Sequence, residues 1–344
     1  MDACTRRRRW TRAAGWLLLG WFPLAPAAAT AQGPRWIPAR DDRETYAVVD
    51  ALFMQRDTNT NDATLVIDGD TQTPALVAGD LLFPTAPGLR VLLGRHGGGQ
   101  AGWELGYLGV YGMLADAETK GPGSLEVTPP LSSEVASLAN ASAAGATYGS
   151  SLNMAEANLI HTDRRVSHCR PSGYRFERQP CSATVDWLAG FRWAGLDERA
   201  AIELDSGYDV RATSNLFGGQ LGVRGRADWR AWALEGWLKA ALCGAALSQR
   251  QDPIVDAFTG DVYRTGRGSE TGTVGGVFDL GGALVYRIDE TWGLRAGYTM
   301  LWLTGVALAP DQFDFSTNID AGTAVDGNAT LWLGGATLGL EARW

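Results

Sequence analysis

Few residues of this chain have the spacing that catalysis or metal binding requires. The only histidines are His96, beside a run of glycines, and His161 and His168, which flank an arginine-rich stretch. General acid–base and nucleophilic catalysis need a base next to a nucleophile or an activated water. No motif around the three histidines supplies such a pair. We therefore expect no catalytic residues, no bound metal and no cofactor.

The remaining candidate residues are charged side chains that alternate with apolar ones. From Val185 to Trp193, and again from Trp232 to Leu242, one set of alternate residues is apolar and the other carries the charges. Strict alternation predicts strands that have two different faces. In this register thirteen charged side chains share the polar faces: Asp50, Arg90, Glu104, Asp186, Arg192, Arg224, Glu235, Lys239, Asp279, Arg287, Arg295, Glu341 and Arg343.

The last sixteen residues show what those strands build. From Ala329 to Trp344, apolar residues alternate with small or polar ones, and the chain stops on an aromatic residue of the apolar face. An exposed apolar strand is an aggregation hazard in water. Closed barrels in bacterial outer membranes carry outward apolar faces and aromatic girdles at the membrane interfaces. Four tryptophans at the same ends of predicted strands fit one girdle: Trp103, Trp232, Trp292 and Trp344.

The N-terminus and the composition point the same way. Arg6–Arg9 and Arg12 precede an apolar run that ends at Ala29-Thr30-Ala31, so residues 1–31 are predicted to be a signal peptide and 32–44 a periplasmic lead. Without the five arginines and Asp2 of that segment, the totals of 30 basic and 38 acidic residues fall to 25 and 37. A net charge of about −12 disfavours nucleic-acid binding. Since no apolar run of about 18 residues follows, any membrane crossing is made by strands.

Three cysteines remain after the signal peptide. Cys169 and Cys181 bracket a loop, and export favours a disulfide between them. A metal site with His161 and His168 is the alternative, although the spacing matches no common ligand pattern. Cys243 lies within a strand pattern and is expected to be free and packed.

The connections between the predicted strands alternate between long and short. Long polar stretches at 56–87, 115–149, 249–270 and 308–328 alternate with tight turns at 97–101, 228–230 and 289–291, apart from a short turn at 205–207 and the cysteine loop. Long extracellular loops and short periplasmic turns are typical of outer-membrane barrels. We predict an all-β fold in which residues 45–344 form a closed antiparallel transmembrane barrel of about ten strands, or twelve if 56–87 contributes a hairpin. The 115–149 loop is expected to be partly mobile and able to fold in and plug the barrel.

Two details of register are also predicted. The alternation changes phase near Gly195 and again near Ser214 to Leu216, which suggests β-bulges. Between Gly102 and Leu114, alternate residues are expected to share the outward face: Trp103, Leu105, Tyr107, Gly109, Tyr111 and Met113.

Several segments resemble one family. They are Val185-Asp-Trp-Leu-Ala-Gly-Phe-Arg-Trp, Asn215-Leu-Phe-Gly-Gly-Gln-Leu-Gly, Trp232-Ala-Leu-Glu-Gly-Trp-Leu-Lys-Ala and Arg295-Ala-Gly-Tyr-Thr-Met-Leu-Trp-Leu. Together they resemble the beta-barrel porin-7 family of outer-membrane proteins over most of 45–344. The resemblance implies a barrel in the outer membrane and carries no catalytic residues.

Three functions remain open on the sequence. The charged faces could line a solute-filtering lumen, with Glu104, Asp186, Arg192, Arg224, Glu235, Lys239, Asp279, Arg287 and Arg295 as its lining, or they could pair inside a narrow, filled barrel. The narrow interior of ten to twelve strands favours pairing. The number of charges, more than closure needs, nevertheless places a porin-like channel for small solutes slightly ahead as the function. Pairing instead predicts a structural or surface-display barrel. An outer-membrane hydrolase is the third possibility. The expected partners are outer-membrane lipid and the barrel-assembly machinery, engaged through the strand that ends at Trp344.

Overall fold

The structure is a computed structural model. It describes residues 45–57, 63–97, 100–169 and 179–344, and for 164–169 and 179–181 it describes the backbone only. The predicted signal peptide and lead (1–44) lie outside these residues. So do the side chains of Cys169, Cys181 and His168, and the disulfide therefore stays a prediction.

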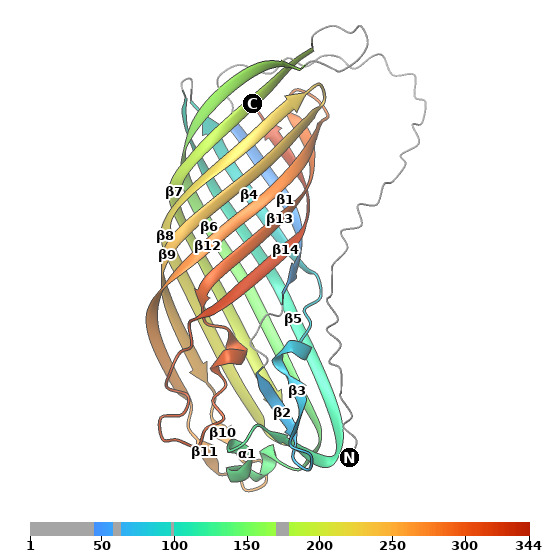
Figure 1. The fold of residues 1–344 in the computed structure, drawn as a ribbon, viewed down its shortest axis with the longest axis vertical. Helices are drawn as coiled ribbons and strands as arrows, with labels where there is room; N and C mark the ends of the chain where they lie inside the picture. The colour runs from blue at the N-terminus through green and yellow to red at the C-terminus, as the bar shows by residue number, and fades with distance from the viewer. Residues whose placement is uncertain (1–44, 58–62, 98–99, 170–178) are drawn as a thin grey trace, which may run out of the picture. The chain divides into compact units, whose positions relative to one another are not determined.

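Ten antiparallel strands close into a barrel (Figure 1). The ring runs β1, β4, β5, β6, β7, β8, β9, β12, β13, β14 and closes where β14 pairs with β1 through contacts such as Ala51 opposite Leu338. The strands are β1 (Thr45–Arg56), β4 (Ala86–His96), β5 (Ala101–Val127), β6 (Ala141–Cys169), β7 (Gln179–Glu203), β8 (Gly207–Trp229), β9 (Trp232–Gln251), β12 (Arg267–Arg287), β13 (Trp292–Val306) and β14 (Ala329–Arg343). The predicted ten-stranded closed barrel is confirmed.

Short elements fill the connections. The stretch 57–85 does contribute a hairpin, β2 (Thr64–Asp68) with β3 (Thr73–Val77), but it attaches to the end of β5 and stays outside the closed ring. A second hairpin joins β10 (Ile254–Val255) to β11 (Val262–Arg264). The helical turns are η1 (Ala78–Asp80), α1 (Leu131–Glu134), η2 (Ala136–Leu138) and η3 (Ala309–Gln312). None of the helices in the described chain is long and apolar enough to span a membrane.

The two ends of the barrel differ as the sequence predicts. Both ends of the described ring, Thr45 and Trp344, lie at the end that carries the tight β4–β5, β8–β9 and β12–β13 turns. We call this the turn end. The hairpins and helical turns gather at the opposite end, the loop end, which is at the bottom of Figure 1.

One predicted loop is wrong. Most of 115–149 is strand, because β5 continues to Val127 and β6 begins at Ala141, which leaves only 128–140 as a connection. Pro122 and two flanking glycines disguised the strand in the sequence. The structure accommodates them in an irregular stretch of the β5–β6 pairing between Lys120 and Leu125, where proline is tolerated.

The predicted bulges near Gly195 and Ser214 are also wrong. β7 pairs with β6 and β8 without a register shift from Ser182 to Glu203, and β8 pairs with β9 without one as well. What changes along these strands is the polarity of each face. On β9, the inward residues are Glu235 and Lys239 near the turn end but Ala245 and Leu247 near the loop end, while the outward ones go from Leu238 to Ser248 and Arg250. At the turn end, the barrel is therefore apolar outside and charged inside. At the loop end, it is polar outside and mainly apolar inside.

Real bulges occur elsewhere. The β5–β6 register shifts between Val110 and Met113, around Gly112 at φ +67°. Met113 is consequently buried inside the barrel, and its predicted outward position is wrong. The β13–β14 register shifts at Gly305, at φ +71°. Left-handed backbone favours glycine, which explains the residue type at both bulges.

Candidate functional site: the barrel interior

The interior of the turn-end half is a layer of charged side chains, which we call the charged layer. It holds six bases and seven acids on inward positions of all ten strands, and nearly all are buried: Asp50, Arg90, Glu104, Glu156, Asp186, Arg192, Arg224, Arg226, Glu235, Lys239, Asp279, Arg295 and Glu341. Such a near balance allows every charge to have an opposite partner. Buried charges need that pairing, because desolvation of an isolated one is very costly.

Arg224 joins three strands on one side of the layer. Its Nε and Nη2 lie 3.0 and 2.8 Å from the Asp186 carboxylate, and its Nη1 donates to Glu104. Tyr46 from β1 donates to the same Glu104 oxygen at 2.5 Å. The contacts therefore cross the lumen from β8 to β5 and β1.

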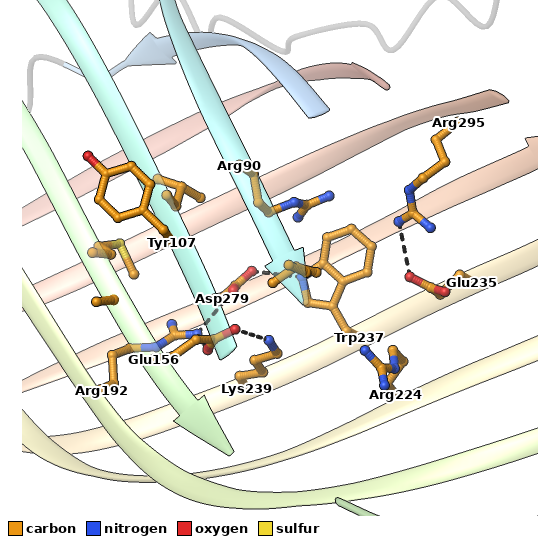
Figure 2. A pocket seen from close by; sticks show the side chains of 15 residues that line it. Arg90, Tyr107, Glu156, Arg192, Arg224, Glu235, Trp237, Lys239, Asp279 and Arg295 are labelled. Atoms are coloured by element: carbon orange, nitrogen blue, oxygen red, sulfur yellow. Dashed lines mark hydrogen bonds and ion pairs between the residues drawn. The ribbon is translucent and has the colours of Figure 1, made fainter. Parts of the chain in front are cut away.

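A second group lies beside it (Figure 2). Arg192 Nη2 contacts Glu156 at 2.5 Å and Asp279 at 3.2 Å. Lys239 bridges Glu156 and Glu104. The indole N–H of Trp237 donates to Asp279 at 2.7 Å. β6, β7, β9 and β12 are thus tied together through the lumen.

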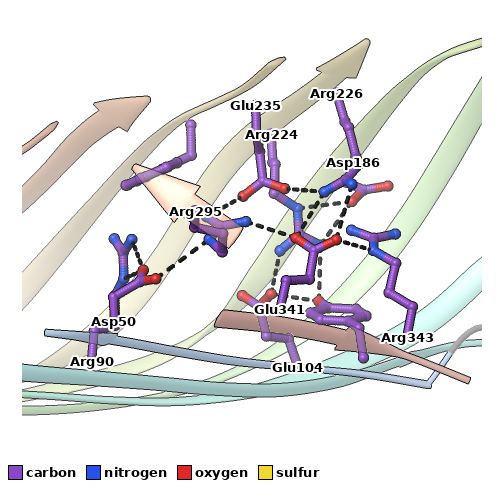
Figure 3. A network of polar contacts seen from close by, with 12 residues as sticks. Asp50, Arg90, Glu104, Asp186, Arg224, Arg226, Glu235, Arg295, Glu341 and Arg343 are labelled. Atoms are coloured by element: carbon purple, nitrogen blue, oxygen red, sulfur yellow. Dashed lines mark hydrogen bonds and ion pairs between the residues drawn. The ribbon is translucent and has the colours of Figure 1, made fainter. Parts of the chain in front are cut away.

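A third group completes the layer (Figure 3). Arg295 reaches Glu341 at 2.8 Å, Glu235 at 3.0 Å and Asp50 at 3.4 Å. Arg226 Nη1 donates to the same two carboxylates, to Glu235 at 3.1 Å and to Glu341 at 2.9 Å. Arg295 and Arg226 are each shared between two or more acids, so the group behaves as a network rather than as separate pairs.

The packing of the layer leaves almost no free space. Trp237 lies so close to Gly281 that a Cβ there would come within 2.2 Å of the ring, and Tyr46 does the same to Gly94 at 2.3 Å. The cavity between the groups holds about 30 Å³, room for two or three waters, whose centres need about 10–15 Å³ each. In this structure the lumen is closed at this level.

The loop-end half of the interior is apolar, and we call it the apolar core. Inward residues of the strands meet residues from the hairpin and helical turns in one contiguous cluster, which includes Leu52, Met54, Leu152, Leu196, Leu216, Leu247 and Leu301 from the strands and Leu65, Leu76, Leu131 and Leu308 from the connections. The cluster has no room for a water-filled passage, because all of these side chains are almost fully buried.

The connection between β13 and β14 supplies the inner part of this core. Residues 306–310 are buried in the barrel, and they are held by polar side chains of the wall. Glu198 accepts the N–H of Ala309 at 3.0 Å, and Ser214 accepts that of Ala307 at 2.9 Å. Gln251 donates to the carbonyl of Gln312 at 2.8 Å. Residues 306–312, which we call the plug, therefore fill the barrel, whereas 115–149 does not.

One buried ion pair lies within the apolar core. Arg56 Nη1 contacts Glu198 at 2.5 Å, and its guanidinium stacks 4.6 Å from the ring centroid of Tyr148 and 4.8 Å from that of Phe83. Asp311 of the plug lies near this pair. Burial, with the nearby carboxylates of Asp326 and Glu198, raises the pKa of Asp311 to about 6.

The structure places all nine predicted lumen residues inside the barrel. Eight belong to or contact the networks above, and Arg287 sits at the turn-end mouth, paired with Asp228. Sequence reasoning missed Glu156, Arg226, Trp237, Arg56 and Glu198. The alternation along each strand could have identified three of them, because alternate residues share a face. Arg226 follows Arg224 by two positions, and Trp237 lies between Glu235 and Lys239. Glu198 has the same even numbering as Arg192 on its strand.

Aromatic side chains form two outward rings. The predicted four, Trp103, Trp232, Trp292 and Trp344, face out near the turn end, together with Trp229 and Tyr286. The second ring went unpredicted. Phe278, Trp302 and Trp332 stack side by side with ring centroids 4.8 Å apart, and Trp193 and Phe217 are opposite each other on β7 and β8.

The histidines described by the structure lie at the turn end. His96 stacks on Tyr46 and contacts the hydroxyl of Thr162 at 3.1 Å, and His161 lies 3.8 Å from Asp163. The Thr162 hydroxyl also donates to Asp186 at 2.7 Å, so His96 joins the edge of the charged layer. Among the described residues, no group of three or more histidines, cysteines or acids is arranged to hold a metal ion, and Cys243 is buried with a free thiol.

No family model and no curated protein matches the chain. Among solved structures, it is similar to the outer membrane protease OmpT from Escherichia coli, with 8% identity over 88% of this chain and 97% of that one, at a TM-score of 0.46. A major outer membrane protein from Thermus thermophilus aligns at 12% identity over 88% and 99%, with a TM-score of 0.32. A FadL homologue from Pseudomonas aeruginosa aligns at 9% over 88% and 90%, with a TM-score of 0.23. Likenesses this distant say nothing about activity.

Proposed function

We propose that the chain is an outer-membrane β-barrel, embedded through the band between its two aromatic rings. On β13 the rings are ten residues apart, at Trp292 and Trp302. Ten residues of a strand tilted by about 40° rise roughly 25 Å, which is the height of the apolar band in outer-membrane barrels. Outward residues between the rings are apolar, as on β9 from Leu234 to Leu242.

We further propose that this barrel is closed and serves as a structural or surface-display barrel. The observation that supports this is the double blockage of the lumen, first by the charged layer and then by the apolar core. A passive channel would need an aqueous path through both. The part beyond the second ring is a filled, water-facing structure that holds the hairpins and helical turns away from the membrane.

A porin-like channel for small solutes is the second candidate. It is favoured by the number of acidic and basic side chains in the lumen, more than closure of a small barrel requires. It would also agree with the family resemblance of the strand motifs. For this function the plug at 306–312 must leave the barrel, and the charged layer must open a path.

Planar-bilayer recordings distinguish the two. For the closed barrel, we expect no discrete conductance steps from refolded protein that shows a heat-dependent shift in gel mobility, the control for correct folding. Replacing 308–326 by a short glycine–serine linker should still give no steps, because the charged layer remains. Steps in the unaltered protein that change size in Arg192→Ala or Arg295→Ala would contradict the proposal and support the porin.

A further inference from the structure

Trp187, Asp163 and His161 form a cluster on the outer face of β6 and β7 near the turn end. Trp187 lies directly opposite His161, and Leu159, the next outward residue of β6, lies opposite Trp103 of the turn-end aromatic ring. The indole N–H of Trp187 donates to Asp163 at 3.2 Å, and His161 Nε2 lies 3.8 Å from the other oxygen of that carboxylate. The cluster therefore lies at the height of the turn-end aromatic ring, where the lipid headgroups of that side begin.

The carboxylate of Asp163 has no basic partner. Its side chain is about half exposed, and among the described side chains, which end at Asp163 on β6, no lysine or arginine contacts it. The acids of the charged layer, by contrast, all pair with arginine or lysine. Charges attract each other more strongly at a membrane interface than in bulk water, because the dielectric constant is lower there. The cluster thus offers an outward negative charge to a cation from the membrane.

The ring of Trp187 adds a second feature that suits a cation. Trp187 is 54% exposed, so much of its ring is accessible from the membrane. Tryptophan binds cations on its ring face better than the other aromatic side chains do. Its N–H donates to the carboxylate of Asp163, which increases the electron density of the ring. An ammonium group between the ring and the carboxylate is attracted by both.

An apolar groove leads from this cluster into the membrane band. It has a volume of about 510 Å³ and crosses the outer face of β6 to β9, with Trp187 at the end nearest to the turn end. Large and small side chains alternate across these strands, because Leu159 lies opposite Ala189 and Leu221 lies opposite Ala240. The small residues leave a furrow between the leucines, and a hydrocarbon chain fits such a furrow.

The cluster and the groove together select the kind of ligand. A soluble amine has no use for an apolar groove, and a plain hydrocarbon has none for a carboxylate. The turn end faces the periplasm in the proposed orientation, and the leaflet on that side consists of phospholipids. A phospholipid with an ammonium headgroup carries both required parts in one molecule.

We propose that this site binds an aminophospholipid of the periplasmic leaflet. The ammonium group lies between Asp163 and the ring of Trp187, and one acyl chain lies in the groove between Leu159 and Leu221. The inference rests on the proposed membrane location.

Native mass spectrometry tests this on protein refolded in vesicles and released in mild detergent. The probes are phosphatidylethanolamine, its N-acetylated form, which lacks the ammonium charge, and phosphatidylglycerol, all with the same acyl chains and in equal amounts. A cation–π contact and an exposed ion pair each contribute about fivefold in affinity, so the unaltered protein should retain phosphatidylethanolamine at least about fivefold more than either of the other two lipids.

Variants locate the preference on the barrel. Trp187→Leu and Asp163→Asn should each lose most of it. Trp103→Leu, at an outward tryptophan of the same ring, and Glu290→Gln, at an exposed acid of the β12–β13 turn, are matched controls and should keep it. Ala240→Leu fills the groove and should lower the retention of phosphatidylethanolamine without changing the order of the lipids.

Each outcome bears on a different claim. Equal retention of phosphatidylethanolamine and its N-acetylated form overturns the inference, and so does a preference that survives both Trp187→Leu and Asp163→Asn or that the two controls lose as well. Unchanged retention by Ala240→Leu overturns the placement of the acyl chain in the groove. If Trp187→Leu does not fold, Trp187→Phe, which keeps a ring but no N–H, should still lower the preference. Protein that fails to enter vesicles contradicts the membrane location itself, whereas inserted protein without the preference contradicts only this site.

Discussion

The carboxylate of Asp311 lies where burial and two neighbouring acids disfavour its charged form. It is partly buried in the plug, one of its oxygens has no hydrogen-bond partner among the described residues, and Asp326 and Glu198 are nearby. The pKa raised to about 6 means that the folded state binds this proton more tightly than the unfolded state does. The ionised carboxylate therefore lowers the free energy of unfolding above pH 6. This destabilisation disappears as the pH falls from about 7 toward 4, because the carboxyl is then protonated in the folded state.

Asp311→Asn should remove that dependence. We expect the variant to be more stable than the unaltered protein at pH 8 and equal to it near pH 4, since the amide resembles the protonated carboxyl. Urea unfolding in vesicles at several pH values measures this, with Asp320→Asn on the exposed part of the same connection as the control. A variant that is less stable at pH 8 would show that the carboxylate has a partner in the folded state.

Among the elements, β13 depends on its bulge. Gly305 has φ +71°, and a Cβ there would come within 2.6 Å of the carbonyl oxygen of Val274. Both effects oppose any side chain at this position. The bulge turns the chain from the wall of the barrel into the buried plug.

Gly305→Ala should therefore destabilise the protein by about 1–3 kcal/mol. Gly244→Ala is the matched control, because that outward glycine has ordinary φ and open space around its Cβ position. Equilibrium unfolding of both variants measures the difference. Equal stabilities would mean that the backbone at 305 relaxes at little cost.

At the scale of the whole molecule, the two halves of the barrel have opposite polarity. A charge added to the outer surface should therefore destabilise the turn-end half and be tolerated on the loop-end half. Leu238 faces out about midway between the rings, and Thr147 faces out on the loop-end half. An arginine facing the lipid at the bilayer midplane costs about 2–4 kcal/mol.

Leu238→Arg should accordingly lower stability by about that amount in vesicles, while Thr147→Arg should be nearly neutral. Unfolding in phospholipid vesicles compared with detergent micelles checks that the cost comes from lipid. A neutral Leu238→Arg would place the membrane elsewhere on the barrel and would contradict the proposed embedding.

The sequence by itself determined the barrel, its strand direction and the side on which most charges lie. It could do so because alternation along one strand is a local property, and the lipid-facing side must be apolar throughout the band. The closing strand before Trp344 and the inward positions of Arg192 and Arg295 are examples. The same local rule failed beyond the second ring, where the inside becomes apolar and Leu196 and Leu216 mimic a change of phase.

Only the tertiary structure decided what fills the barrel. Glu156 meets Lys239, and Glu104 meets Arg224, across strands that are far apart in the sequence, so no local pattern shows whether these charges pair or line an open pore. The plug was equally hidden. Residues 308–328 have the composition of a polar loop. The structure buries 306–310 inside the barrel, where Glu198 and Ser214 accept the main-chain N–H groups of Ala309 and Ala307.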